Sequence, residues 1–242
     1  MQQTPADVQH YKDNPDPRFH RINADYPGLQ AVHADPWVFL VRDMLTAEEC
    51  DALVDKAKPH LKPTRTSGGL RHDRRTSLST RCWAGAQHKM ANLTNLPISH
   101  FEGLKVIHYQ QGGFFKRHHD GFRGAHDETT GQSRWPCVPG DYPNRVVSLI
   151  VYLNDVAHGG STFFTKLGID VRPSKGMGLL FMPSYTATSP VHPGKQDTRL
   201  IHEGRPAGSD KWICTQWGWS CEYIQHLDPA SGFPPGLGRS PF

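Results

Sequence analysis

The stretch KRHHDGF, residues 116–122, places two histidines and an aspartate side by side. In an extended strand, side chains alternate between the two faces, so His118 and Asp120 share one face and His119 points the other way. One imidazole and one carboxylate on the same face can bind a single metal ion. We therefore expect His118 and Asp120 to be metal ligands, and His119 to serve packing or to face solvent.

A third ligand must come from a distant part of the chain. His202 in TRLIHEGRP is the best candidate, because an apolar run carries it into a turn. His108 and His126 are weaker candidates, since the first suits a core position and the second falls in a loop-like segment. Two histidines and one carboxylate on one face of an octahedron are typical of non-haem Fe(II) oxygenases. An H-x-D triplet also arises by chance in a chain with 15 histidines.

A lysine stands where this chemistry would need a cation. Lys211 follows His202 by nine residues, across the turn EGRPAGSD. A lysine among inward-facing apolar neighbours is costly to bury without an anion. A dicarboxylate cosubstrate could supply that anion, with one end chelating iron and the other paired with Lys211. The alternative is a lysine at a strand end that extends its amine to solvent. The expected strand face carries Lys211, Ile213, Thr215, Trp217 and Trp219.

Many short strands would have to position these side chains. From Leu104 onward, short alternating or β-branched runs are broken by turn signals, and the chain has 23 Gly and 20 Pro. This texture favours a sandwich or barrel. We therefore expect a mainly β protein with flanking helices, an α+β chain. The predicted strands are GLKVIHYQ, FFKRHHD, NRVVSLIVYLND, STFFT, GMGLLFMP, TRLIHE and KWICTQWGWS.

Supporting elements precede these strands. WVFLVRDML (37–45) predicts a strand, and a helix follows in which Thr46 and Glu49 form a capping box. Residues 62–83 are basic and lack periodicity, which indicates a long mobile loop or a hairpin with a loose tip. HKMANLTNLP predicts a second helix that ends near Pro97.

We expect one domain with short extensions, and no internal repeat. The expected parts are a polar N-terminal extension (1–35), a single domain (36–226) with supporting helices and a substrate loop (36–103) and a strand core (104–226), a surface excursion (121–143) and a Pro/Gly-rich tail (227–242).

The composition excludes several classes of protein. A hydrophobic fraction of 36% argues against a disordered chain, and the net charge of +4 does not indicate nucleic-acid binding by itself. No stretch has the roughly 18 apolar residues of a membrane helix. Five cysteines without a CxxC pair argue against a complete disulfide framework and favour a reducing compartment. The amino terminus shows no secretion signal, so we expect a cytoplasmic protein, with a secretory compartment still open for a trimmed chain.

Taken in order, these segments resemble the 2-oxoglutarate- and Fe(II)-dependent prolyl 4-hydroxylases, particularly the smaller plant, algal and viral type. The resemblance runs from about Val38 to Trp217. Individually GGST or HxD is a weak motif, whereas the ordered set is specific. The segments are LTAEECDAL, RTS at Arg75 to Ser77, EGLKVIHYQQGGFFKRHHD, RVVSLIVYLNDVAHGGSTFF, VRPSKGMGLLF and RLIHEGRPAGSDKWICTQW.

The resemblance implies a double-stranded β-helix, or jelly-roll, core and a set of site residues. Iron is expected on His118, Asp120 and His202, which with Lys211 form the catalytic set. The residues expected to contact 2-oxoglutarate are Tyr109, Thr162, Lys211 and Trp217, with Lys211 on the distal carboxylate. Those expected near a peptide substrate are Arg75 and Ser77 on a mobile loop, Arg145, and Trp219.

The implied activity is that of an oxidoreductase, a procollagen-proline 4-dioxygenase-like enzyme. The cofactors would be Fe(II), 2-oxoglutarate, O2 and ascorbate (L-ascorbic acid). 2-Oxoglutarate would be converted to succinate and CO2 while a peptidyl proline is hydroxylated. The expected partner is a proline-containing peptide or protein, without nucleic acid or membrane, and the expected state is a monomer.

The chain departs from the family pattern at positions that bear on the substrate. Ser161 stands where a glutamate is usual, Phe164 where a proline is usual, and Trp219 where a histidine is frequent. The excursion at 121–143 is also long. These departures leave open the same chemistry on another substrate, such as a free amino acid, a lysyl side chain or a small metabolite.

Two further alternatives differ in class. A nucleic-acid demethylase would suit the basic loop 62–83, but that class resembles a pattern with arginine on the cosubstrate carboxylate, where this chain has Lys211. A non-catalytic jelly-roll binding module would have no physical need to keep His118, Asp120, His202 and Lys211 together.

Overall fold

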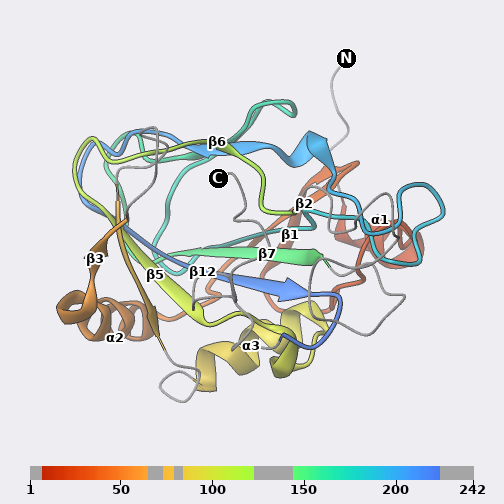
Figure 1. The fold of residues 1–242 in the computed structure, drawn as a ribbon, viewed down its shortest axis with the longest axis horizontal. Coiled ribbons are helices and arrows are strands. Elements are labelled where there is room, and N and C mark those ends of the chain that lie inside the picture. The colour runs from red at the N-terminus through yellow and green to blue at the C-terminus, as the bar shows by residue number, and fades with distance from the viewer. Residues whose placement is uncertain (1–6, 65–72, 79–83, 123–143, 224–242) are drawn as a thin grey trace, which may run out of the picture.

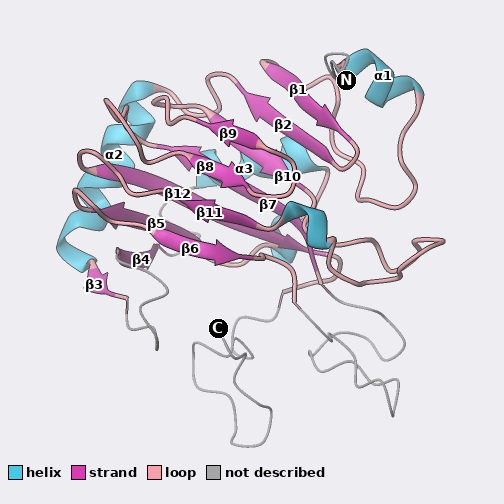
Figure 2. Ribbon diagram, turned by 90° about the horizontal axis from the view of Figure 1, so that it is seen from above, coloured by secondary structure: helices cyan, strands magenta, loops and turns pink. Residues whose placement is uncertain are grey.

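Two antiparallel β-sheets face each other at the centre of the protein (Figures 1 and 2). The computed structural model describes residues 7–64, 73–78, 84–122 and 144–223. The larger sheet has the order β1-β2-β10-β7-β12-β5-β4-β3, and the smaller has the order β6-β11-β8-β9. The larger sheet consists of β1 (Leu29–Ala34), β2 (Trp37–Val41), β3 (Lys62–Pro63), β4 (Arg74–Leu78), β5 (Leu104–Tyr109), β7 (Arg145–Tyr152), β10 (Gly178–Phe181) and β12 (Lys211–Trp219). The smaller consists of β6 (Phe115–His118), β8 (Thr162–Phe164), β9 (Ile169–Val171) and β11 (His202–Gly204).

Two α-helices cover the outer face of the larger sheet. They are α2 (Ala47–Ala57) and α3 (Ala84–Thr94), and in Figure 1 they lie below the sheet, on the side away from β6. The predicted capping box is confirmed, because the Thr46 hydroxyl accepts from the Glu49 amide and the Glu49 carboxylate accepts from the Thr46 amide. The box satisfies two backbone donors that the helix itself leaves unpaired.

Strand β7 shows why the larger sheet has two different faces. Val147, Leu149 and Val151 join the apolar cluster that includes residues of α2 and α3. Ile150 and Tyr152 alternate with them and join the second cluster, which lies between the two sheets. An even alternation of buried residues on both faces fits a central strand that is covered on each side. The mainly β prediction with flanking helices is therefore confirmed.

The N-terminal segment differs from its sequence expectation. Residues 7–34 carry α1 (Val8–Asp13) and β1, and they bury Tyr11, Phe19 and Ile22 against the rest of the core. The Tyr11 hydroxyl accepts from the Ile22 amide, and Tyr11 packs edge-on against Trp37. The polar, Pro-punctuated sequence indicates a loose arm, whereas a few spaced aromatic side chains are enough to anchor it.

Short helical turns and a hairpin connect several of these elements. Within the described ranges, 3-10 turns lie at Lys58–His60, Ile98–His100 and Thr198–Leu200. Strands β3 and β4 pair antiparallel, which fits the hairpin alternative for 62–83. The tip of that hairpin, most of the excursion from 123 to 143 and the tail from 224 lie outside the described residues.

None of the helices in the described part of the chain is long and apolar enough to cross a membrane. Cys50 and Cys214 are free and buried. Cys221 is disulfide-bonded, whereas the odd number of cysteines favours reduced thiols.

Candidate active site

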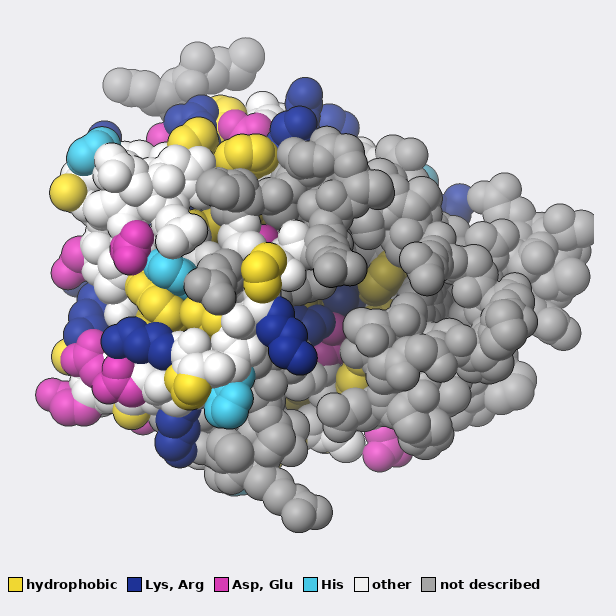
Figure 3. Space-filling model, turned by 60° about the vertical axis from the view of Figure 1, so that its left-hand side comes forward, with side chains coloured by type: hydrophobic (Ala, Val, Ile, Leu, Met, Phe, Trp, Pro, Cys, Tyr) yellow, Lys and Arg dark blue, Asp and Glu magenta, His cyan; other side chains and the backbone are white. Residues whose placement is uncertain are grey.

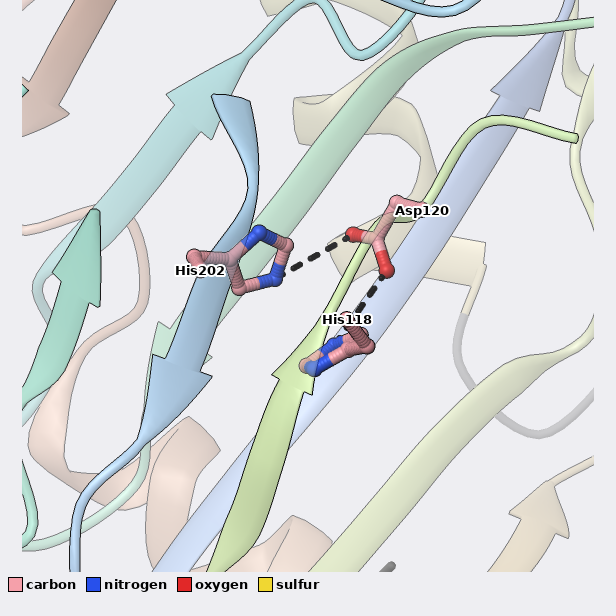
Figure 4. A group of neighbouring side chains, drawn as sticks. All are labelled: His118, Asp120 and His202. Atoms are coloured by element: carbon pink, nitrogen blue, oxygen red, sulfur yellow. Dashed lines mark ion pairs between the residues drawn. The ribbon is translucent and has the colours of Figure 1, made fainter. Parts of the chain in front are cut away.

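His118, Asp120 and His202 come together although 82 residues separate the second from the third. Their strands are neighbours, since β11 pairs with β6 and places His202 directly opposite His118. Asp120 follows β6 by two residues. The His118 Nε2 lies 3.6 Å from Asp120 Oδ1, and the His202 Nε2 lies 3.9 Å from Asp120 Oδ2 (Figure 4). The three donor groups thus converge on one point.

Backbone carbonyls fix the orientation of both imidazoles. The Nδ1 of His118 lies 2.8 Å from the Lys116 carbonyl oxygen, and the Nδ1 of His202 lies 2.9 Å from the Leu200 carbonyl oxygen. A carbonyl only accepts, so each Nδ1 carries the proton and each Nε2 keeps a lone pair. Such bonds orient metal-binding histidines in general.

Asp120 is held as a buried carboxylate. Burial alone would raise its pKa, but His202, His118 and Arg145 and a hydrogen bond from Ser148 hold the pKa well below the usual range. The Ser148 Oγ donates to Asp120 Oδ2 over 2.7 Å. Because Ser148 lies on β7, this bond joins the metal-binding loop to the larger sheet.

The donor set fits a divalent transition metal. In the described part of the chain, these three side chains form the one group of His, Cys, Asp or Glu with ligand atoms all within 4.8 Å of one another. Two imidazoles and one carboxylate are the ligands that Fe(II) takes in non-haem oxygenases. The arrangement can therefore hold Fe(II) and leave other coordination positions for small ligands.

His119 does more than pack or face solvent. Its Nε2 lies 2.6 Å from the Asp197 carbonyl oxygen, and its Nδ1 accepts from the Gly121 amide over 3.0 Å. His119 therefore links the loop after β6 to the segment that leads into β11. The loop that carries Asp120 and the segment before His202 are tied together through this ring.

Lys211 is buried at the start of β12, with 3% of its surface exposed. Its Nζ donates to the Gly160 carbonyl oxygen over 2.5 Å, and no carboxylate in the described part of the chain lies within ion-pair distance. Burial lowers the pKa of Lys211 to about 7. Gly160 has a φ of +65°, and a Cβ there would lie 3.3 Å from the Lys211 Cδ, so glycine permits this close approach.

Aromatic and hydroxyl groups surround the lysine. The Nζ lies 5.2 Å from the ring centre of Tyr109 and 5.7 Å from that of Tyr152. The Tyr152 hydroxyl donates to the Thr162 Oγ1 over 2.8 Å, across the gap between the sheets. Tyr109, Thr162 and Lys211, which the sequence groups as cosubstrate contacts, thus lie around one buried position.

Trp217 lies elsewhere on the same strand, six residues from Lys211 and roughly 20 Å away at about 3.3 Å per residue. It pairs with Ser148, and the Arg145 guanidinium lies 4.2 Å from its ring centre. The register between β12 and β7 skips Val146 of β7, because Gly218 pairs with Val147 and Trp219 pairs with Arg145. Such a bulge re-aims side chains at a strand end.

The remaining predicted residues are placed as follows. Trp219 is buried and stacks on Phe122 at 5.5 Å. Arg75 and Ser77 lie on β4, opposite Ile107 and Lys105 of β5, and their side chains lie outside the description. His108 stacks on Trp212, away from the metal cluster. His126 lies outside the described residues.

Sequence reasoning missed the polar residues that support the site. Ser148 and Tyr152 lie on the inner face of β7, and Glu102 precedes β5. A signal existed for the first two, because they are four apart in VVSLIVYL and interrupt an otherwise apolar strand. No comparable signal marks Glu102.

Comparisons with known proteins agree with this geometry. A sequence model of the 2OG-Fe(II) oxygenase superfamily matches residues 104–219. Probable prolyl 4-hydroxylase 3 of Arabidopsis thaliana is 28% identical over 229 residues, which cover 78% of this chain and 71% of that protein. Prolyl 4-hydroxylase 1 of the same plant is 27% identical over 239 residues, covering 87% of this chain and 78% of that protein.

A solved structure shares the fold. The viral collagen prolyl hydroxylase of Paramecium bursaria Chlorella virus-1, in its complex with 2-oxoglutarate, superposes with a TM-score of 0.56 at 23% identity. The match covers 76% of this chain and 96% of that one. The facing sheets described above are therefore the predicted jelly-roll. The two imidazoles and the carboxylate fall within the matched segment, so residues 104–219 are a 2OG-Fe(II) oxygenase domain, and the chain is a dioxygenase similar in sequence to the prolyl 4-hydroxylases.

Proposed function

We propose that this chain hydroxylates peptidyl proline, with iron on His118, Asp120 and His202 and with 2-oxoglutarate paired to Lys211. One observation carries the proposal: Lys211 is buried without a carboxylate partner in the described residues, in the same interior as the His–Asp–His group. A buried ammonium of this kind is costly unless an anion accompanies it. A dianionic cosubstrate supplies that anion.

The protein's part in the metal chemistry is to hold and orient. His118 and His202 offer Nε2 lone pairs fixed by their backbone hydrogen bonds, and Asp120 offers a carboxylate kept ionised by its surroundings. Fe(II) bound there would supply O2 activation and the oxidative decarboxylation of 2-oxoglutarate to succinate and CO2. Asp120 and His202 are buried, so the side chains themselves keep water away from most of the ligand set.

The cosubstrate position follows from the same contacts. The distal carboxylate of 2-oxoglutarate would replace the Gly160 carbonyl as the main partner of the Lys211 ammonium. Thr162 and Tyr109 lie within the same surroundings and could donate to that carboxylate. Binding of a dianion would raise the pKa of Lys211 and keep the amine charged.

An aromatic wall beside Asp120 suits a pyrrolidine ring. The half-buried Phe122 and Trp217 and the buried Trp219 gather around the Arg145 guanidinium, so Phe122 and Trp217 form the accessible part of this wall. Arg145 also donates to the Asp120 carbonyl oxygen. Flat, partly apolar surfaces of this kind bind proline-rich segments, which arrive extended at low entropic cost. The Arabidopsis relatives carry the name prolyl 4-hydroxylase, which supports the same substrate.

The charge on the described part of one face does not favour a nucleic-acid substrate. On the face in Figure 3, acidic side chains lie beside basic ones around an apolar centre, where described atoms are visible. A nucleic-acid-binding surface carries a field of one sign. Under this proposal the partner is a proline-containing peptide that a monomer can bind.

Succinate release tests the proposal. Anaerobically iron-loaded protein is given 2-oxoglutarate, O2 and ascorbate, with a proline-rich peptide, the same peptide with alanine for proline, free amino acids, or no addition. We expect stimulation by the proline peptide alone and collapse of turnover in Lys211→Ala. Stimulation by a free amino acid instead would keep the chemistry and replace the substrate. No turnover with iron bound would contradict the proposed activity.

A further inference from the structure

Glu102 is a buried acid that the proposed reaction does not use. It lies just before β5 with 3% of its surface exposed. Arg145 approaches its Oε1 to 2.6 Å through both Nε and NH2, and Lys105 donates to its Oε2 over 2.7 Å. The Trp219 indole donates to the same Oε1 over 3.1 Å. Burial opposes ionisation, but the two cations lower the pKa of Glu102 to about 2.

Arg145 joins this acid to the metal site. Its NH1 donates to the Asp120 carbonyl oxygen over 3.1 Å, while its Nε and NH2 are taken by Glu102. The bulge between Gly218 and Trp219 shifts the register at Arg145, and its guanidinium lies against Trp217. The guanidinium therefore contacts the Glu102 carboxylate on one side and the Asp120 backbone on the other. The side-chain carboxylate of Asp120 is one of the proposed metal ligands.

This arrangement matters because the Arg145 guanidinium already contacts Asp120, through the backbone carbonyl of that residue. A guanidinium prefers a bidentate carboxylate partner. If Glu102 lost its charge, the buried guanidinium would have no partner that balances it, and removing one member of a buried pair is strongly unfavourable. The Asp120 carboxylate would then become its alternative partner and would be drawn away from the metal.

We propose that Glu102 is a positioning residue for the metal site. Its carboxylate forms an ion pair with the Arg145 guanidinium. Arg145 then donates only to the backbone of Asp120, and the Asp120 carboxylate is left to bind the metal. This inference rests on the proposed metal ligands. It also assigns Arg145 a role in the free enzyme, in addition to the wall that it forms for substrate.

Binding of Mn²⁺, a redox-stable divalent ion, tests this without turnover. We expect Glu102→Gln to weaken Mn²⁺ binding by about 10- to 100-fold, as loss of supporting contacts around metal ligands does. Removing the freed guanidinium as well should restore affinity, so E102Q/R145Q should bind Mn²⁺ as R145Q does. Glu49→Gln is the matched control, because Glu49 also pairs with a cation, Lys89, away from the site. It should bind Mn²⁺ like the parent protein.

The outcomes separate the possibilities. Unchanged Mn²⁺ affinity in E102Q, or a double variant as weak as E102Q itself, would overturn the inference, since a merely structural role predicts no rescue. If E102Q does not fold, the comparison of E102Q/R145Q with R145Q and of the charge-keeping Glu102→Asp with the parent protein decides in the same way. Failure of the parent protein to bind Mn²⁺ would instead overturn the proposed ligand set, and the inference with it.

Discussion

Lys211 is the residue whose chemistry can be measured without knowing the substrate. Below pH about 7 the amine is charged in both the folded and the unfolded protein. Between pH about 7 and 10.5 only the unfolded chain keeps the proton, because burial lowers the pKa in the folded state. Stability therefore rises with pH through this window.

We predict that the free energy of unfolding of the metal- and cosubstrate-free protein increases between pH 7 and 10 by more than that of Lys211→Met. The difference is about 4 kcal/mol, since three pH units contribute about 1.36 kcal/mol each. Urea unfolding at a series of pH values measures it. Parallel pH profiles for the two proteins would contradict the burial of an uncompensated amine.

The lowered pKa of Lys211 also predicts how the affinity for the cosubstrate depends on pH. Since 2-oxoglutarate requires the charged amine, its affinity should fall as the pH rises above about 7, where free Lys211 loses its proton. Calorimetric titration with Mn²⁺-loaded protein measures this dependence. An affinity that is constant from pH 6 to 9 would argue against Lys211 as the carboxylate partner.

At the scale of elements, two of the side-chain hydrogen bonds made by β7 cross to the side of the smaller sheet: Ser148 donates to Asp120, in the loop after β6, and Tyr152 donates to Thr162 on β8. We predict that Ser148→Ala weakens Mn²⁺ binding by about tenfold, because contacts that orient a ligand carboxylate are worth that much. Tyr152→Phe is the comparison, since it breaks the other link and leaves Asp120 untouched. Equal losses of Mn²⁺ affinity in both variants would indicate general loosening of the sheets and would contradict a specific role for Ser148.

Elements also show which parts of the site a sequence can predict. Alternation alone groups His118 with Asp120 and Lys211 with Thr215, because it needs no knowledge of the neighbouring strands. Pairing of β6 with β11 depends on contacts distant in sequence, so alternation cannot supply it. Alternation also places Trp217 and Trp219 on one face, but it does not predict that the register skips Val146 of β7 and so pairs Arg145 with Trp219.

At the scale of the whole molecule, the N-terminal segment belongs to the folded domain. Its sequence is polar on average, so composition indicates an extension, whereas anchoring depends on individual side chains such as Tyr11 and Phe19. An average over a window cannot detect such anchors. The pattern of many short strands does not depend on single anchoring side chains, and the fold class could therefore be predicted from the sequence.

We predict that Tyr11→Ala lowers the free energy of unfolding by about 3–5 kcal/mol, the usual cost of removing a buried aromatic ring. Denaturant unfolding followed by circular dichroism measures the change. Val191→Ala serves as a control, because Val191 is 51% exposed and should shift stability by less than about 0.5 kcal/mol. Equal stabilities of Tyr11→Ala and the parent protein would mean that the segment contributes nothing to the fold.

The proposed activity requires that O2 be split between the cosubstrate and a peptidyl proline. Incubation of the iron-loaded protein with 2-oxoglutarate and a proline-rich peptide under oxygen-18 gas tests this directly. We predict one heavy oxygen in succinate and one in a hydroxyproline of the peptide, measured by mass spectrometry. Heavy succinate beside an unmodified peptide, or a peptide that takes its oxygen from water, would contradict the account.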